Sequence, residues 1–208
     1  MWIVSGVWLA LAQSAPSLQI GAVNELPSPL WIFGYGSLIW RPDFPFVEQR
    51  PALIDGYERR FWQGSPDHRG TPESPGRVVT LIPIPSARCA GVAYRIADEL
   101  VAPVIAHLDH REKGGYERHV VTLELAPSPT SRLDSAKLES IRGLIYVAVE
   151  GNPSFLGDAP LENIAQTVRT SRGPSGSNHE YVVRLAEALR AMGAPDPHVE
   201  SLVSMLHG

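Results

Sequence analysis

The chain has 208 residues, which is enough for one domain with a sizeable hydrophobic core. With 44% hydrophobic and 19% charged residues, its composition is that of a folded globular protein and excludes global disorder. The formal net charge is −4 and no cluster of Lys and Arg is present, so the basic footprint of a nucleic-acid-binding protein is excluded. The 19 prolines and 18 glycines predict many tight connections, as in a β-rich or α+β fold.

The opening segment, residues 1–29, begins with an apolar run that no Lys or Arg precedes. The run is interrupted by Ser5 and Gly6 and is too short to span a bilayer. We therefore expect an N-terminal extension, either poorly ordered or docked on a single domain at residues 30–208. The alternative is a signal peptide, with Leu11 to Ala15 as the small-residue cleavage site.

The stretch Trp31 to Trp40 begins as a buried strand and then breaks into Gly34-Tyr35-Gly36-Ser37. Two glycines around a tyrosine allow a positive φ and the close approach of a ligand to bare N–H groups. Such a turn can hold an anion such as a carboxylate. The alternative is a bulge or tight corner of a barrel, and local chemistry alone favours this alternative.

Strand patterns follow along the chain. Residues Leu53 to Trp62 alternate loosely and predict a long strand, and Gln63 to Pro75 predict a long polar loop of the kind that often carries function. Arg77 to Ile84 and Arg88 to Ile96 are two further predicted strands. The Pro85-Ser86-Ala87 turn between them predicts a hairpin.

The pattern becomes helical at Asp98, a predicted cap for a helix that stops at Gly114-Gly115. Its predicted apolar positions are Leu100, Val101, Val104, Ile105 and Leu108. Two strands, Tyr116 to Leu125 and Ile141 to Val149, come next.

The end of the chain is predicted to be helical. The three helices expected there run from Pro160 to about Thr170, from about His179 to Met192 after a cap at Ser177 or Asn178, and from about Pro197 to Leu206.

The spacing of cysteines, histidines and serines indicates which kinds of reactive site the chain can form. Cys89 is the only cysteine, so an intrachain disulfide and a set of cysteine zinc ligands are excluded, and its strand context predicts a small buried hydrophobe. No HxH or HExxH spacing is present among the seven histidines. Ser37 follows a glycine but is not in a Gly-x-Ser-x-Gly elbow. The charged run Asp109 to Lys113 alone indicates a solvated helix end.

Eight sequence blocks in order make the chain resemble the ChaC-type γ-glutamylcyclotransferases, in their glutathione-specific branch. The blocks are Phe33 to Trp40, Arg59 to Ser65, Asp67 to Gly70, Pro75 to Leu81, Gly91 to Arg95, Arg111 to Tyr116, Asn152 to Glu162 and Gly173 to Tyr181. The resemblance implies an α+β fold with a small mixed β-barrel flanked by helices. It also implies a lyase that cleaves glutathione into 5-oxo-L-proline and L-cysteinylglycine without water, metal or organic cofactor.

The same resemblance assigns the site. It implies that the loop from Phe33 to Leu38 holds the γ-glutamyl group and that Glu112 is the general acid/base. The implied substrate-binding residues are Phe33, Gly34, Tyr35, Gly36, Ser37, Leu38 and Tyr181. His68 and Arg69 are expected to shape the dipeptide side of the pocket; the alternative is a loop held by its own polar contacts.

The chemistry fits these residue types. The substrate's α-amine must lose a proton and attack its own γ-carbonyl, and one carboxylate can take that proton and return it to the leaving amine. For this role the pKa of Glu112 should be raised by burial, which Arg111 and Lys113 would oppose unless they point away.

The expected partner is glutathione as a small-molecule substrate, with no nucleic acid or membrane, and the expected protein is a cytosolic monomer. Two alternatives remain. One is cyclotransferase action on γ-glutamyl amino acids or γ-glutamylamines, and the other is a barrel or regulatory partner that binds such a group without turning it over.

Overall fold

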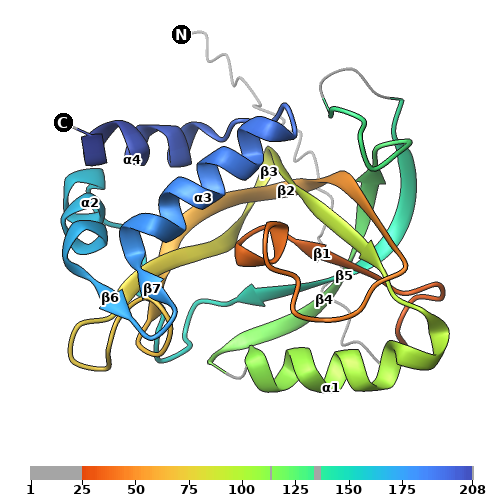
Figure 1. Cartoon of the computed structure of the whole chain (residues 1–208), viewed down its shortest axis with the longest axis horizontal. Helices are drawn as coiled ribbons and strands as arrows, with labels where there is room; N and C mark the ends of the chain where they lie inside the picture. Colours follow the sequence, from red (N-terminus) through yellow and green to blue (C-terminus); the bar gives the residue numbers. More distant parts are fainter. Residues whose placement is uncertain (1–24, 113, 134–136, 208) are drawn as a thin grey trace, which may run out of the picture.

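The computed structural model describes residues 25–112, 114–133 and 137–207 (Figure 1). Its centre is a closed barrel with the strand order β1-β3-β2-β4-β5. The strands are β1 (Trp31–Gly34), β2 (Glu48–Ser65), β3 (Gly76–Arg95), β4 (Tyr116–Leu125) and β5 (Glu139–Ala148). Neighbouring strands are antiparallel except where β5 closes onto β1 in parallel, with Ile32 opposite Leu144. The small mixed barrel expected from the sequence is confirmed.

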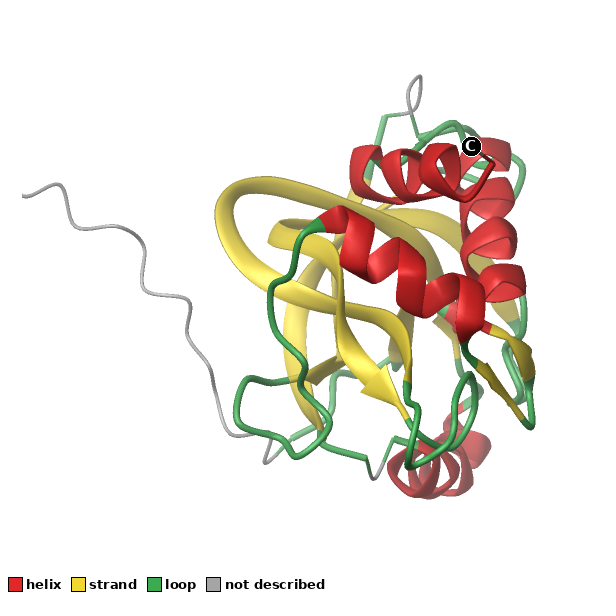
Figure 2. Ribbon diagram, turned by 90° about the vertical axis from the view of Figure 1, so that its left-hand side faces the viewer, coloured by secondary structure: helices red, strands yellow, loops and turns green. Residues whose placement is uncertain are grey.

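Helices lie on two sides of this barrel. They are α1 (Val101–Arg111), α2 (Leu161–Thr170), α3 (Asn178–Ala191) and α4 (Pro197–His207). The last three pack against one another on one side, and α1 lies alone on the opposite side (Figures 1 and 2). Short elements complete the fold: the 3₁₀ turns η1 (Ser37–Ile39) and η2 (Asp98–Leu100), and a small hairpin of β6 (Arg172–Gly173) and β7 (Gly176–Ser177).

Alternation along the strands divides the core into two clusters. Because successive strand residues point to opposite faces, Trp31 and Phe33 of β1 join the cluster that fills the barrel and continues under α2, α3 and α4. Ile32 points the other way, into the cluster under α1. The buried face of α1, formed by Val104, Ile105 and Leu108, is the one predicted from its spacing.

The predicted hairpin around Pro85 is wrong. The two predicted strands are halves of the single strand β3, which pairs with β2 along almost its whole length. Between the pairs Asp55–Arg88 and Tyr57–Pro83, residues 84–87 of β3 bulge out opposite Gly56, whose φ is +81°. The prolines at 83 and 85 therefore mark a wide bulge in a long strand rather than a chain reversal.

Other boundaries agree with or refine the expectations. Strand β4 has the predicted limits, and Ser177 caps α3 by accepting a hydrogen bond from the Glu180 N–H at 3.1 Å. Asp98 makes no capping hydrogen bond; it begins η2, a 3₁₀ turn that leads into α1 at Val101. Cys89 is buried and free, as predicted.

Residues 1–24 of the expected extension and Lys113 lie outside the described residues. Within the ranges that are described, no helix combines the length and the apolar character needed to cross a membrane.

Candidate active site

A cavity of about 260 Å³ opens between the β1–η1 turn, the end of β2 and the end of α1. The structure places all eight of the site residues expected from the sequence on its wall: Phe33, Gly34, Tyr35, Gly36, Ser37, Leu38, Glu112 and Tyr181. Their roles remain predictions at this point. They come from three separate parts of the chain, which the barrel and α3 bring together.

Crowding restricts the two glycine positions of the turn, and the positive φ that glycine allows is not used there. Neither Gly34 nor Gly36 has a positive φ. A Cβ on Gly34 would lie 2.5 Å from Cβ of Leu38, because the chain folds back on itself into η1. A Cβ on Gly36 would lie 3.0 Å from the Tyr181 hydroxyl and 3.1 Å from Cγ2 of Val79. A Cβ at Gly34 would therefore force the turn to move, whereas one at Gly36 would require its neighbours to shift by a few tenths of an ångström.

The turn exposes N–H groups that have no acceptor in the protein. Its carbonyl oxygens are used, because Ile39 N–H donates to Gly36 at 3.0 Å and Trp40 N–H to Ser37 at 3.2 Å. The N–H groups of Gly36, Ser37 and Leu38, in contrast, donate no hydrogen bond within the described part of the chain. Free N–H groups at the start of a turn on a cavity wall are suited to hold an anion.

Glu112 caps the C-terminus of α1 and brings a carboxyl group to the cavity. Its side chain is only 16% exposed. Burial raises the pKa of Glu112 from its ordinary value, and the negative charges of Asp43 and Asp67 act in the same direction. The Arg111 guanidinium opposes this rise, but burial outweighs it. A raised pKa makes the Glu112 carboxylate a stronger base, which suits it to accept a proton from a ligand.

Arg111 does not point away from Glu112, so its positive charge opposes the rise in the pKa of Glu112. Its Nε lies 3.1 Å from Oε1 of Glu112, while its terminal nitrogens contact Asp43 Oδ1 at 2.5 Å and donate to Ser37 Oγ at 2.8 Å. The guanidinium thus shares its charge between two carboxylates. It also ties the glutamate to the turn that carries the free N–H groups.

Three tyrosines, Tyr35, Tyr116 and Tyr181, line the same cavity as the Glu112 carboxyl group. Burial raises the pKa of Tyr181 to about 12 and the pKa values of Tyr35 and Tyr116 well above their ordinary value, and the Glu112 charge adds to each shift. All three therefore remain protonated phenols. Tyr35 donates to the Tyr146 carbonyl at 2.8 Å, while Tyr181 accepts weakly from the Val79 N–H at 3.4 Å.

Tyr116 is a lining residue that sequence reasoning missed. Its hydroxyl has no hydrogen-bond partner among the described residues, which leaves it available to a ligand. The signal that could have found it is its position at the end of the Arg111 to Tyr116 block. Arg111 was noticed there only as an opposing charge, and its contact with Ser37 was not expected.

His68 and Arg69 also line the cavity. Arg69 is buried, donates to the Ser177 carbonyl at 3.1 Å and to Glu180 at 3.3 Å, and lies over the Tyr181 ring at 5.6 Å. His68 is exposed, with Nδ1 at 3.1 Å from Ser175 Oγ. The Arg69 side chain therefore pairs with β7 and α3, whereas His68 contacts Ser175 of the β6–β7 turn and, at 3.9 Å, Asp67 of its own loop.

No group of three or more His, Cys, Asp or Glu side chains is placed to hold a metal ion within the described ranges.

Comparison with known proteins identifies the family. Residues 30–207 match the family model for ChaC-like proteins. Glutathione-specific gamma-glutamylcyclotransferase 1 of Rattus norvegicus is 42% identical over 193 residues, which cover 91% of this chain and 83% of that protein. The glutathione-specific gamma-glutamylcyclotransferase of Saccharomyces cerevisiae is 35% identical over 205 residues, which cover 79% of this chain and 87% of that protein.

A solved structure has a similar fold. The selenomethionine-labelled crystal structure of the γ-glutamyl cyclotransferase specific to glutathione from yeast superposes with a TM-score of 0.78 at 31% identity, covering 86% of this chain and 95% of that one. The barrel and its flanking helices thus have a γ-glutamylcyclotransferase-like fold. The chain belongs to the ChaC-like family.

Proposed function

We propose that this protein is a glutathione-specific γ-glutamylcyclotransferase that degrades glutathione to 5-oxo-L-proline and L-cysteinylglycine. The curated relatives named above carry this activity in their names and match the chain over most of both lengths. The observation that carries the proposal is the placement of a buried carboxyl group, Glu112, in the same cavity as the free N–H groups of the β1–η1 turn.

The turn is proposed to hold the γ-glutamyl end of the substrate. The N–H groups of Gly36, Ser37 and Leu38 bind its α-carboxylate, and Ser37 acts as a binding hydroxyl rather than a nucleophile. Arg111 already donates to the Ser37 oxygen at 2.8 Å, which fixes the hydroxyl but does not remove its proton. Phe33 and Tyr181 complete the walls around the γ-glutamyl chain.

Glu112 is proposed to move the proton. Its carboxylate takes a proton from the substrate's α-amine, the amine nitrogen attacks the γ-carbonyl carbon, and a five-membered ring closes. The C–N bond to the cysteinyl residue then breaks, and the carboxyl group returns the proton to the leaving amine. No atom is added from water, and the proton count balances. Because the reaction is intramolecular, holding the substrate folded supplies several kcal/mol of the barrier reduction, on the order of that measured for well-oriented groups.

The test is an assay of the purified protein with glutathione and with γ-glutamyl-alanine in ¹⁸O-labelled water. Equal amounts of 5-oxoproline and cysteinylglycine should form from glutathione, with no label in either product, and γ-glutamyl-alanine should react more slowly. Faster reaction of γ-glutamyl-alanine would favour the alternative class of γ-glutamyl amino acid substrates. Labelled glutamate would indicate hydrolysis. No product from either compound would favour a protein that only binds γ-glutamyl groups.

We further propose that the protein acts as a cytosolic monomer without a cofactor, with residues 30–208 as the catalytic domain. A single buried thiol, Cys89, fits a reducing compartment. Light scattering of the purified full chain should give the mass of one copy, and a mass of two copies would contradict the monomer.

A further inference from the structure

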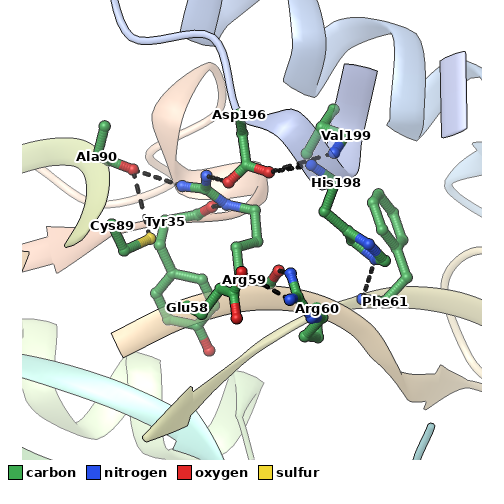
Figure 3. Close-up of polar contacts among 10 residues, drawn as sticks. All are labelled: Tyr35, Glu58, Arg59, Arg60, Phe61, Cys89, Ala90, Asp196, His198 and Val199. Carbon is green, nitrogen blue, oxygen red and sulfur yellow. Dashed lines mark hydrogen bonds and ion pairs between the residues drawn. The ribbon is translucent and has the colours of Figure 1, made fainter. Parts of the chain in front are cut away.

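Arg59 is a fully buried cation at the base of the site, in the middle of β2. Its side chain is 1% exposed, and each of its nitrogens has a partner (Figure 3). Nε donates to the Tyr35 carbonyl at 2.9 Å, Nη1 to Asp196 Oδ2 at 2.7 Å, and Nη2 to the Ala90 carbonyl. Because a buried charge is costly unless it is paired and hydrogen-bonded, the guanidinium can hold only this arrangement.

Asp196 fixes the guanidinium from the far end of the chain. It stands just before α4, where its Oδ1 accepts from the N–H groups of His198 at 3.0 Å and Val199 at 3.2 Å. One carboxylate therefore caps α4 and, through its other oxygen, holds Arg59 (Figure 3). The result is a rigid connection from the C-terminal helix to the backbone of the β1–η1 turn.

The contact with Tyr35 determines the orientation of the next N–H group. A trans peptide is planar, so the Gly36 N–H points opposite to the Tyr35 carbonyl, which is directed at Arg59. Gly36 lines the cavity, and its N–H donates to nothing in the described chain. The hydroxyl of Tyr35 is anchored separately on Tyr146. A cation on the carbonyl side also polarises the peptide and makes its N–H a better donor.

Stability alone does not account for this pair. Replacing a buried ion pair by apolar residues of similar volume is often neutral or stabilising. We propose that Arg59, held by Asp196, is a positioning residue that aims the Gly36 N–H at the γ-glutamyl carboxylate. This inference rests on the proposed function, because it concerns how the same cavity holds its substrate.

The decisive variant is the double substitution Arg59→Met/Asp196→Asn. It removes both charges together, so neither is left buried alone, and Asn can still accept the α4 N–H groups. Because the Tyr35 and Ala90 carbonyls lose a donor, we expect the unfolding midpoint to fall modestly while the double variant still folds. KM for glutathione should rise by about tenfold to a hundredfold, as for the loss of a hydrogen bond to a charged group, while kcat changes less.

Two further variants separate positioning from stability. Arg59→Lys keeps the charge next to Asp196 but lacks the planar fork that reaches both carbonyls, so KM should again rise. Val199→Ala is the matched control: Val199 is buried in α4, and its N–H is retained. It should lower the unfolding midpoint and leave KM and kcat unchanged when measured well below that midpoint.

The possible results each decide the question. Wild-type kinetics in the folded double variant or in Arg59→Lys would overturn the proposal, and so would an equal rise of KM in Val199→Ala. Failure of both Arg59 variants to fold would assign the pair to stability and overturn it too. The wild-type assay is read first: if the wild type releases no 5-oxoproline from glutathione, the proposed function fails, whereas an active wild type with unaffected variants defeats the positioning role alone.

Discussion

At the scale of single residues, Glu112 is subject to two opposing influences. Burial and two nearby carboxylates raise its pKa, while Arg111 at 3.1 Å lowers it. Arg111 is shared with Asp43 and Ser37, so its charge does not cancel the effect of burial. The carboxylate can therefore accept a proton from the attacking amine and give it back to the leaving amine, which ring closure requires.

Substitution of Glu112 tests its proposed role. Glu112→Gln keeps the shape of the side chain and should leave the fold intact, but it removes the group that accepts the proton. We expect 5-oxoproline release from glutathione to fall by about a hundredfold to ten-thousandfold, as for the loss of a general acid/base. Circular dichroism serves as the control for folding. Near-wild-type release by this variant would refute the assignment.

The raised pKa of Glu112 also makes a prediction about stability and pH. The folded protein binds this proton more tightly than the unfolded chain does, so the charged carboxylate destabilises the fold above the raised pKa, and this penalty disappears as pH falls below the ordinary value of 4.5. Glu112→Gln should thus increase the free energy of unfolding at about pH 8 and have little effect at about pH 4. Urea titrations of the wild type and of Glu112→Gln at both pH values measure this difference in the free energy of unfolding. If the variant is no more stable than the wild type at the higher pH, a raised pKa of Glu112 is contradicted.

At the scale of elements, the end of β1 and the turn η1 form one crowded unit. Gly34 lies against Leu38 of the same turn, so the path of the chain depends on the missing side chain. The long strands β2 and β3 give this unit its support, since Val79 and Arg59 contact it from two sides. The path of the turn is therefore determined by packing and not by an unusual φ.

Alanine scanning of the two glycines tests this packing. In Gly34→Ala the new Cβ would lie 2.5 Å from the Leu38 Cβ, so the backbone of η1 must move and substrate binding should be lost. In Gly36→Ala the contacts are 3.0 and 3.1 Å with side-chain atoms that can shift slightly. We expect the unfolding midpoint and kcat/KM to fall much further in the first variant. An equal or opposite order would show that crowding at Gly34 does not shape the turn.

At the scale of the whole molecule, the barrel and the layer of α2, α3 and α4 share one hydrophobic core. Leu185 of α3 is fully buried in the cluster that also contains Phe61 of β2 and Val79 of β3. Tyr181, on the same helix, belongs to this cluster and also lines the cavity. Because the helices complete both the core and the site, the two layers should unfold together.

This shared core predicts a cooperative loss of stability. Leu185→Ala should lower the free energy of unfolding by about 2–5 kcal/mol, as for other large-to-small changes in a packed core. Tryptophan fluorescence and far-ultraviolet circular dichroism should report one coincident transition. Glu187→Ala, on the exposed face of α3, is the control and should change the value by less than about 0.5 kcal/mol. Two separate transitions would contradict a shared core.

The sequence by itself determined the local elements and the candidates for chemistry. The limits of β4, the buried face of α1 and the cap at Ser177 follow from periodicity and capping, which depend on neighbours a few residues away. The order of the sequence blocks pointed to the family, and the resemblance to that family, not the charged run itself, implied Glu112 as the acid/base.

The tertiary structure alone decided which distant groups meet. Closure of β5 onto β1, the bulge that joins two predicted strands into β3, and the pair of Arg59 with Asp196 all depend on contacts between remote segments. The same holds for the pKa of Glu112, since burial depends on what surrounds the side chain. The turn at Gly34 and Gly36 shows the difference: the sequence indicated that glycine is needed there, but only the fold shows that the cause is the close approach of Leu38, Val79 and Tyr181.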